Sequence, residues 1–129
     1  MIYLDTSVAL AQILAEDRYP PADLWMETLV SSRLLEYEIW TRIQARRLAL
    51  SHGDAVHALL GRIALLEMIP EVVARARERF PVPLRTLDAL HLASLRFLTE
   101  QGQPTVLASY DERMLAAARR MKIDIYSLG

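Results

Sequence analysis

Residues 86–111 read TLDALHLASLRFLTEQGQPTVLASYD, and they indicate the fold class more clearly than any other part of the chain. From Thr86 to about Glu100 the apolar residues recur at helical spacing, and Gly102 favours the end of that helix. Residues 105–108 then form a short apolar run, which predicts a buried strand, and Asp111 follows it. A helix that leads directly into a buried strand is typical of a parallel sheet covered by helices.

The same alternation extends over the rest of the chain. It predicts strands at residues 2–4, 29–32, 68–69, 105–108 and 123–126. It predicts helices at residues 6–16, 22–29, 33–48, 54–66, 71–80, 86–100 and 111–121, with Ser51-His52-Gly53-Asp54 as a break between the third and the fourth. No repeat or linker divides the chain, so we expect one domain over residues 1–129. The fold class predicted is a three-layer α/β/α domain around a short, mostly parallel sheet.

Composition excludes several classes of function. The chain has no cysteine, which rules out disulfides, thiolate metal sites and cysteine nucleophiles. The net charge of −1 gives no general attraction to nucleic acids or membranes, although 14 of the 15 basic residues are arginines. No apolar run is long enough to span a membrane, and the N-terminus reaches Asp5 without a basic segment. We therefore expect a cytoplasmic protein without a signal peptide.

Acidic residues follow two of the predicted strands. Asp5 comes directly after strand 2–4, and Asp111 comes shortly after strand 105–108. Because parallel strands end at the same edge of a sheet, these two acids share that edge. Each acid alone is also explained as a favourable charge at the start of a helix. Asp88 fits that explanation less well, since it lies in the first turn of an apolar helix, where a buried carboxylate is costly without a partner.

A fourth acid lies on the helix predicted at residues 33–48. Residues two apart on a helix point about 200° apart, so only one of Glu36 and Glu38 can face the other acids. Glu38 has more apolar neighbours, but Arg42 lies four residues later and offers it a surface ion pair. The residues by themselves leave this choice open.

Four carboxylates from four segments predict a site for a hard cation. Oxygen ligands suit Mg²⁺ or Mn²⁺, and either ion would let a phosphodiester approach the acids and would activate a water molecule against phosphorus. His91 lies one turn after Asp88, and on so apolar a helix we predict a packed, hydrogen-bonded histidine rather than a metal ligand.

The ordered motifs resemble the PIN domain family, and most closely the VapC-type toxins of bacterial toxin–antitoxin pairs. Four segments carry the resemblance: IYLDTS at residues 2–7, VSSRLLEYEI at residues 30–39, LDALHLA at residues 87–93 and SYD at residues 109–111. The similarity covers essentially the whole chain, in the family's order.

The resemblance implies a metal-dependent endoribonuclease that hydrolyses RNA phosphodiesters. It implies that the metal ligands and catalytic acids are Asp5, Glu38, Asp88 and Asp111, and the pattern Ser-Ser-x-Leu-x-x-x-Glu selects Glu38 over Glu36. It also implies supporting hydroxyls at Thr6 and Ser109, a homodimer, and a small antitoxin protein that blocks the acidic site. Arg42, Arg85 and Arg113 are candidates for binding RNA phosphate because they lie near the acids in sequence.

Other classes are weaker. A haloacid-dehalogenase phosphatase needs a second acid two residues after the first, where this chain has Ser7, and a receiver domain needs paired acids beside Asp5. Two alternatives within the same fold remain. One is a non-catalytic PIN-like binding module, and the other is an RNA-processing nuclease outside any toxin–antitoxin system.

Overall fold

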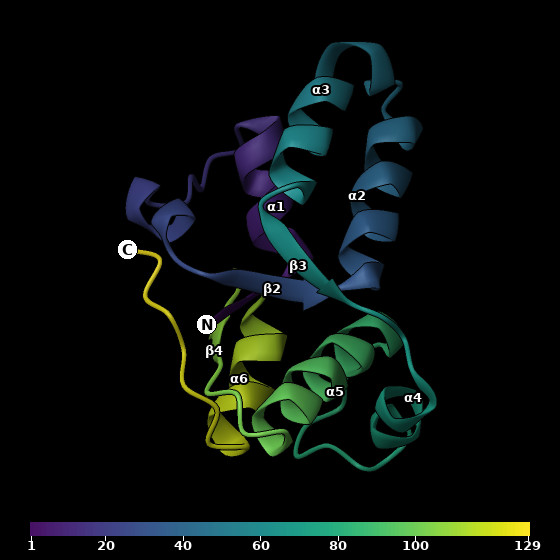
Figure 1. Ribbon diagram of the computed structural model, residues 1–129, viewed down its shortest axis with the longest axis vertical. Helices are drawn as coiled ribbons and strands as arrows, with labels where there is room; N and C mark the ends of the chain where they lie inside the picture. The colour runs from purple at the N-terminus through teal and green to yellow at the C-terminus, as the bar shows by residue number, and fades with distance from the viewer.

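A four-stranded parallel sheet lies at the centre of the computed structural model, which describes residues 1–129 (Figure 1). The strands are β1 (Ile2–Leu4), β2 (Leu29–Ser32), β3 (Ile63–Leu66) and β4 (Val106–Ala108), in the order β3-β2-β1-β4. In the register of the sheet, Tyr3 of β1 pairs with Val30 of β2 on one side and with Leu107 of β4 on the other. β1 and β2 are therefore the inner strands, and both are buried along their whole length.

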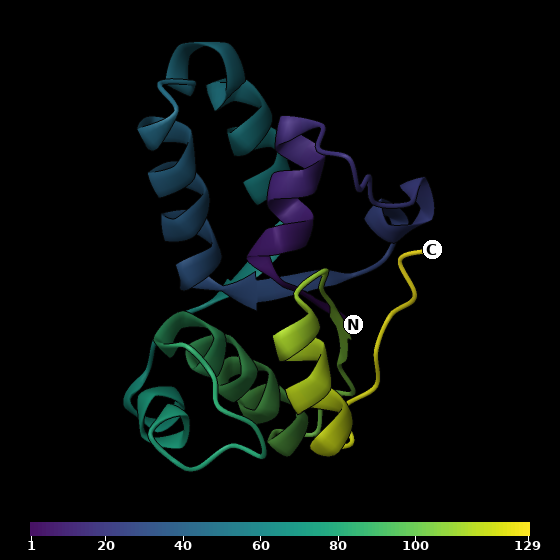
Figure 2. The same ribbon diagram turned by 180° about the vertical axis from the view of Figure 1, so that it is seen from behind.

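Helices cover both faces of the sheet, which confirms the predicted three-layer α/β/α class. Figures 1 and 2 show one layer made of α1 (Thr6–Leu14), α2 (Arg33–Ala45) and α3 (Ala49–Leu60). The opposite layer consists of α4 (Pro70–Ala76), α5 (Thr86–Glu100) and α6 (Glu112–Arg120). The chain moves outward from β1 to β3 and then returns across the sheet to β4. Because crossovers between parallel strands are right-handed, this reversal places the later helices on the other face.

Two hydrophobic clusters fill the space between the layers. Ile2 and Leu4 belong to the cluster on the α1–α3 side, whereas Tyr3 belongs to the cluster with α5 and α6. This division follows from the alternation of side chains along a strand. Since β1 is buried on both faces, it has no charged side chain until Asp5, at its carboxyl end.

The structure corrects the prediction for residues 51–69. α3 begins at Ala49 and runs through Ser51-His52-Gly53-Asp54 to Leu60, so that segment does not separate two helices. Gly53 is buried against α2, where a Cβ would lie 3.8 Å from the Trp40 ring. Packing against α2 therefore overrides the turn preference of these residues. The predicted helix 54–66 is helical only as far as Leu60, because residues 63–66 form β3 along the edge of β2, and the predicted strand 68–69 does not form.

Smaller corrections concern element ends. The predicted helix 22–29 is only a 3₁₀ helix, Ala22–Met26, because the chain must extend again into β2. The predicted helix 71–80 stops at Ala76, short of Pro81, which disfavours helix in the residue before it. The predicted strand 123–126 contributes a single bridge between Leu107 and Ile125. None of the helices combines the length and the apolar character needed to cross a membrane.

Candidate functional site

Asp5 lies at the point where the strand order reverses, between the carboxyl ends of β1 and β4. Its backbone N–H donates to the carbonyl oxygen of Ala108 at 3.0 Å, which ties the two strand ends together. The residue is only 5% exposed, and its Oδ2 accepts hydrogen bonds from Ser7 Oγ at 2.6 Å and Ser109 Oγ at 2.9 Å. Two hydroxyls from different segments thus hold the Asp5 carboxylate in one orientation. Crevices at such reversals are the usual ligand sites of open parallel sheets.

Asp111 is joined to Asp5 through Ser109. The Ser109 hydroxyl donates to Asp5 and accepts from the backbone N–H of Asp111 at 2.9 Å. Asp111 Oδ1 caps α6 by accepting from the N–H groups of Arg113 and Met114 at 2.9 and 3.1 Å. Helix capping therefore occupies one carboxylate oxygen of Asp111 and leaves Oδ2 to face the other acids.

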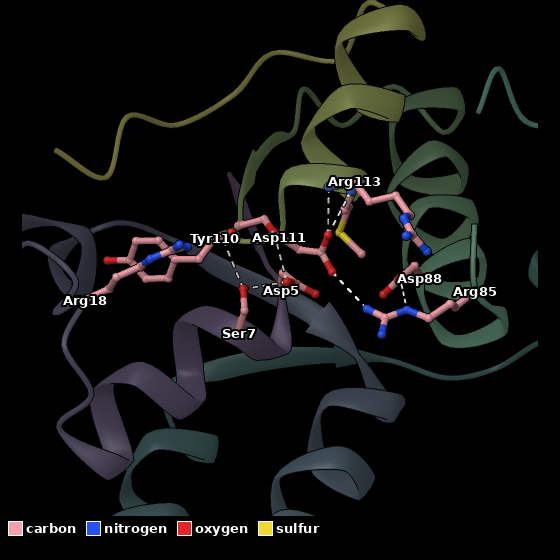
Figure 3. Close-up of polar contacts among 10 residues, drawn as sticks. Asp5, Ser7, Arg18, Arg85, Asp88, Tyr110, Asp111 and Arg113 are labelled. Atoms are coloured by element: carbon pink, nitrogen blue, oxygen red, sulfur yellow. Dashed lines mark hydrogen bonds and ion pairs between the residues drawn. The ribbon is translucent and has the colours of Figure 1, made fainter. Parts of the chain in front are cut away.

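Asp88 comes to the same place from the first turn of α5 (Figure 3). Arg85 donates from Nε to Asp88 Oδ2 at 3.2 Å and from a terminal nitrogen to Asp111 Oδ2 at 3.3 Å. Burial raises the pKa of Asp88, and the charges of Asp111 and Asp5 raise it further, while Arg85 lowers it in part. Asp5 and Asp111 therefore lie close enough to Asp88 to disfavour its charge, and a single exposed arginine bridges Asp88 and Asp111.

Glu38, and not Glu36, turns toward these aspartates. Glu38 Oε1 accepts from Thr6 Oγ1 at 2.9 Å and lies 2.6 Å from His91 Nε2. Glu36 points outward and pairs with Arg33 at 3.1 Å. The surface ion pair between Glu38 and Arg42, which the sequence left open, does not form. Helix α2 thus presents one glutamate to the site and the other to solvent.

A buried chain of hydrogen bonds runs from Tyr3 through His91 to Glu38 and holds the Glu38 carboxylate in place. The Tyr3 hydroxyl lies 2.8 Å from His91 Nδ1, and burial raises the pKa of Tyr3. When His91 is neutral and donates from Nε2 to Glu38, its Nδ1 accepts from Tyr3. Burial alone lowers the pKa of His91, but the bond to Glu38 and the charges of Asp5, Glu38 and Asp88 outweigh it and raise that pKa. The predicted packed, hydrogen-bonded histidine is confirmed.

Tyr3→Phe tests this network. The substitution removes one hydroxyl and leaves His91 Nδ1 as a buried acceptor without a donor, so we expect the free energy of unfolding to fall by about 1–3 kcal/mol. Urea denaturation of both proteins would measure the change. Unchanged stability would show that the Tyr3 hydroxyl does not bond His91, whereas Tyr19→Phe, which alters an exposed tyrosine, serves as the control.

The remaining predicted residues divide into two groups. Thr6 and Ser109 contact carboxylates as expected, although Thr6 bonds Glu38 rather than its neighbour Asp5. Of the predicted arginines, Arg85 binds two of the acids, while Arg42 and Arg113 form no ion pair. Ser7, which orients Asp5, was not predicted from the sequence. A hydroxyl two residues after the strand-end acid was the available signal.

The donor set fits a hard divalent cation in its chemistry, since it offers carboxylate oxygens from four segments at one edge. In the arrangement seen here, no three acidic or histidine side chains are grouped so that they could hold an ion together. Arg85 bonds Asp88 and Asp111 instead. Its side chain is 70% exposed, so its contact with the carboxylates is not enclosed by the core.

The fold and this site together define a class of α/β/α proteins, in which acids from separate segments meet at the carboxyl edge of a parallel sheet. Within that class the chain belongs to the PIN domain family, whose model matches residues 2–120. It is 30% identical over 135 aligned positions to Ribonuclease VapC35 of Mycobacterium tuberculosis, with all of this chain and 98% of that protein covered. It is 27% identical over 128 positions to Ribonuclease VapC47 of the same species, which covers 94% of this chain and 92% of that protein.

Proposed function

We propose that this chain is a metal-dependent endoribonuclease, the toxin of a VapBC-type toxin–antitoxin pair. The observation that carries the proposal is that Ser109 links Asp5 to Asp111 and Arg85 links Asp111 to Asp88, which brings acids from three segments to one edge of the sheet. Burial and the charges of the other two acids also raise the pKa of Asp88. Arg85 offsets only part of the cost of ionising Asp88, and perturbed acids of this kind cluster at functional sites. The relatives named ribonuclease supply the substrate class.

Mg²⁺ or Mn²⁺ is the proposed cofactor, held by Asp5, Asp88 and Asp111 with Glu38 beside them. When bound, the ion would activate water and stabilise negative charge on the scissile phosphate.

The chain's own residues orient and position the reacting groups. Ser7 and Ser109 fix the Asp5 carboxylate, and Thr6 and His91 fix that of Glu38. Arg85, released from the aspartates, would bind an RNA phosphate at the edge of the site. Arg42 and Arg113 are further candidates because no carboxylate neutralises them.

Partners follow from the resemblance. A small antitoxin that covers the acidic site, a homodimer and a cytoplasmic location are parts of the same proposal. An RNA-processing nuclease outside a toxin–antitoxin pair would use the same chemistry, and the two differ only in whether a neighbouring antitoxin inhibits cleavage. A non-catalytic module would not cleave RNA at all.

Chelation and restoration of metal test the proposed reaction. We expect the purified chain to cleave labelled single-stranded RNA in Mn²⁺, to lose that activity in EDTA, and to recover it when Mn²⁺ is added in excess. Calorimetric titration of the metal-free protein with Mn²⁺ should show saturable binding. Cleavage that persists in EDTA would contradict metal dependence, and a folded protein that neither binds Mn²⁺ nor cleaves RNA would contradict the proposal as a whole.

A further inference from the structure

A groove of about 420 Å³ opens beside the acids, and the function proposed above assigns no part of the RNA to it beyond a phosphate at Arg42. Ser7 and Asp111 line both this groove and the acidic site, so the two are continuous. Its volume lies in the range of small-molecule binding sites. Figure 3 shows two residues of the groove, Arg18 and Tyr110, on one side of Asp5 and Asp111, with Arg85 and Asp88 on the other. An RNA strand that crosses the acids would therefore pass through the groove on one side.

One wall of the groove is a paired arginine and tyrosine. The Arg18 guanidinium lies 5.5 Å from the centre of the Tyr110 ring and donates to the Tyr110 carbonyl oxygen at 2.9 Å. The backbone N–H of Tyr110 donates to Ser7 Oγ, the same hydroxyl that holds Asp5. Flat guanidinium and aromatic groups are the surfaces on which proteins stack the bases of single-stranded RNA. In this protein Ser7 links the Arg18–Tyr110 surface to the Asp5 carboxylate.

The rest of the groove is mixed in character. Leu10 and Ala11 of α1 line it but are almost fully buried, at 7% and 2% exposed, whereas Arg42 of α2 contributes a cation with no carboxylate partner. Glu16 and Asp17 also line the groove and form no ion pairs either. The flat wall of Arg18 and Tyr110, a free cation and free carboxylates suit a nucleotide, in which a flat base carries hydrogen-bond donors and a phosphate carries negative charge.

We propose that this groove binds the nucleotide next to the scissile phosphate, a proposal that rests on the ribonuclease function proposed above. Its base packs against the wall formed by Arg18 and Tyr110, and Arg42 binds its phosphate. Glu16 and Asp17 accept hydrogen bonds from the edge of the base, which favours guanine, whose amino group donates, over uracil, which has none.

Steady-state cleavage of labelled single-stranded RNA tests the groove through Arg18→Ala and Tyr110→Leu. Loss of one stacking surface should raise KM about tenfold while kcat stays within about twofold, because neither side chain touches the reacting atoms. Arg119→Ala is the matched control, since it removes the same charge from an exposed position on α6, outside the groove. Tyr110→Leu keeps apolar bulk against the core, so circular dichroism should show an unchanged fold.

A second measurement is independent of catalysis. In nuclear magnetic resonance titrations of the wild type, guanosine monophosphate should shift the Ala11 methyl and the Tyr110 ring saturably. Uridine monophosphate should bind about fivefold or more weakly. Both shifts should disappear in Arg18→Ala and persist in Arg119→Ala.

The outcomes separate the groove from the proposed function. If the wild type cleaves RNA in Mn²⁺ but Arg18→Ala has the same KM and neither mononucleotide shifts Ala11 or Tyr110, the groove proposal is overturned and the ribonuclease stands. If mononucleotides bind as described but the wild type cleaves no RNA, the groove is a nucleotide site and the proposed function fails. Equal affinity for the two mononucleotides would overturn the assignment of Glu16 and Asp17.

Discussion

Asp88→Asn is expected to abolish RNA cleavage and, at the same time, to raise the free energy of unfolding. Loss of a group that merely orients a metal ligand costs roughly 10- to 100-fold, so loss of a ligand should exceed about 100-fold. Saturable Mn²⁺ binding should weaken in parallel. The stabilising effect has a different origin, because asparagine removes a partly buried charge that Asp111 and Asp5 repel.

The sign of the stability change follows from the pKa. Since the folded state raises the pKa of Asp88, the folded protein holds that proton more tightly than the unfolded chain does. The free energy of unfolding therefore falls as pH rises from the ordinary aspartate pKa through the raised one, and the ionised carboxylate is destabilising at neutral pH. The raised pKa already includes the favourable ion pair with Arg85, so losing that pair in the variant does not reverse the sign.

Thermal unfolding at neutral pH in EDTA, together with the cleavage assay in Mn²⁺, measures both effects. Asp54→Asn, which neutralises an exposed aspartate on α3, should change neither. An Asp88→Asn protein that is folded and still cleaves RNA at the wild-type rate would remove Asp88 from the proposed site. A variant that is less stable than the wild type in EDTA would contradict the repulsion among the aspartates.

Glu38→Gln and Glu36→Gln form a matched pair on one helix, two residues apart, with opposite expected results. The glutamine in the first variant would keep a carbonyl oxygen that accepts from Thr6 and His91, so the side chain should stay in place while its charge is lost. Cleavage should therefore fall by about 100-fold or more if the Glu38 charge serves the metal site. Glu36→Gln removes only an exposed pair with Arg33, and cleavage should stay within about twofold of the wild type.

The stability of this pair provides an internal check. Glu38→Gln weakens a charge-assisted hydrogen bond to His91, so its free energy of unfolding should drop by about 1 kcal/mol. Chemical denaturation of both variants beside the cleavage assay would separate lost stability from lost chemistry. Equal activity in the two variants would show that the orientation of Glu38 has no bearing on function.

The sequence was most informative where local patterns and the fold agree. The helix at residues 86–100 has the bounds predicted for it, and β1 ends at the residue before Asp5 as expected. It was least informative where packing overrides local preference. Ser51-His52-Gly53-Asp54 looks like a turn, yet it lies inside α3 because Gly53 packs against Trp40. Strand β3 was missed because an apolar run of four residues after a helix has the same pattern as the end of that helix.

The candidate site also has features that the sequence predicts and features that depend on the packing of distant segments. The sequence by itself determined that Asp5 and Asp111 share an edge, because parallel strands that end in the same direction leave their last residues together. Only the tertiary structure decided that Glu38 faces inward, since the choice depends on Thr6 and His91, which are 32 and 53 residues away along the chain. The contact of Arg18 with Tyr110, across 92 residues, is also decided by the tertiary structure alone. The spacing of apolar residues and the direction of each strand depend on neighbouring residues, so both can be predicted from the sequence. The hydrogen-bond partner of a side chain depends on which distant segments the fold brings together.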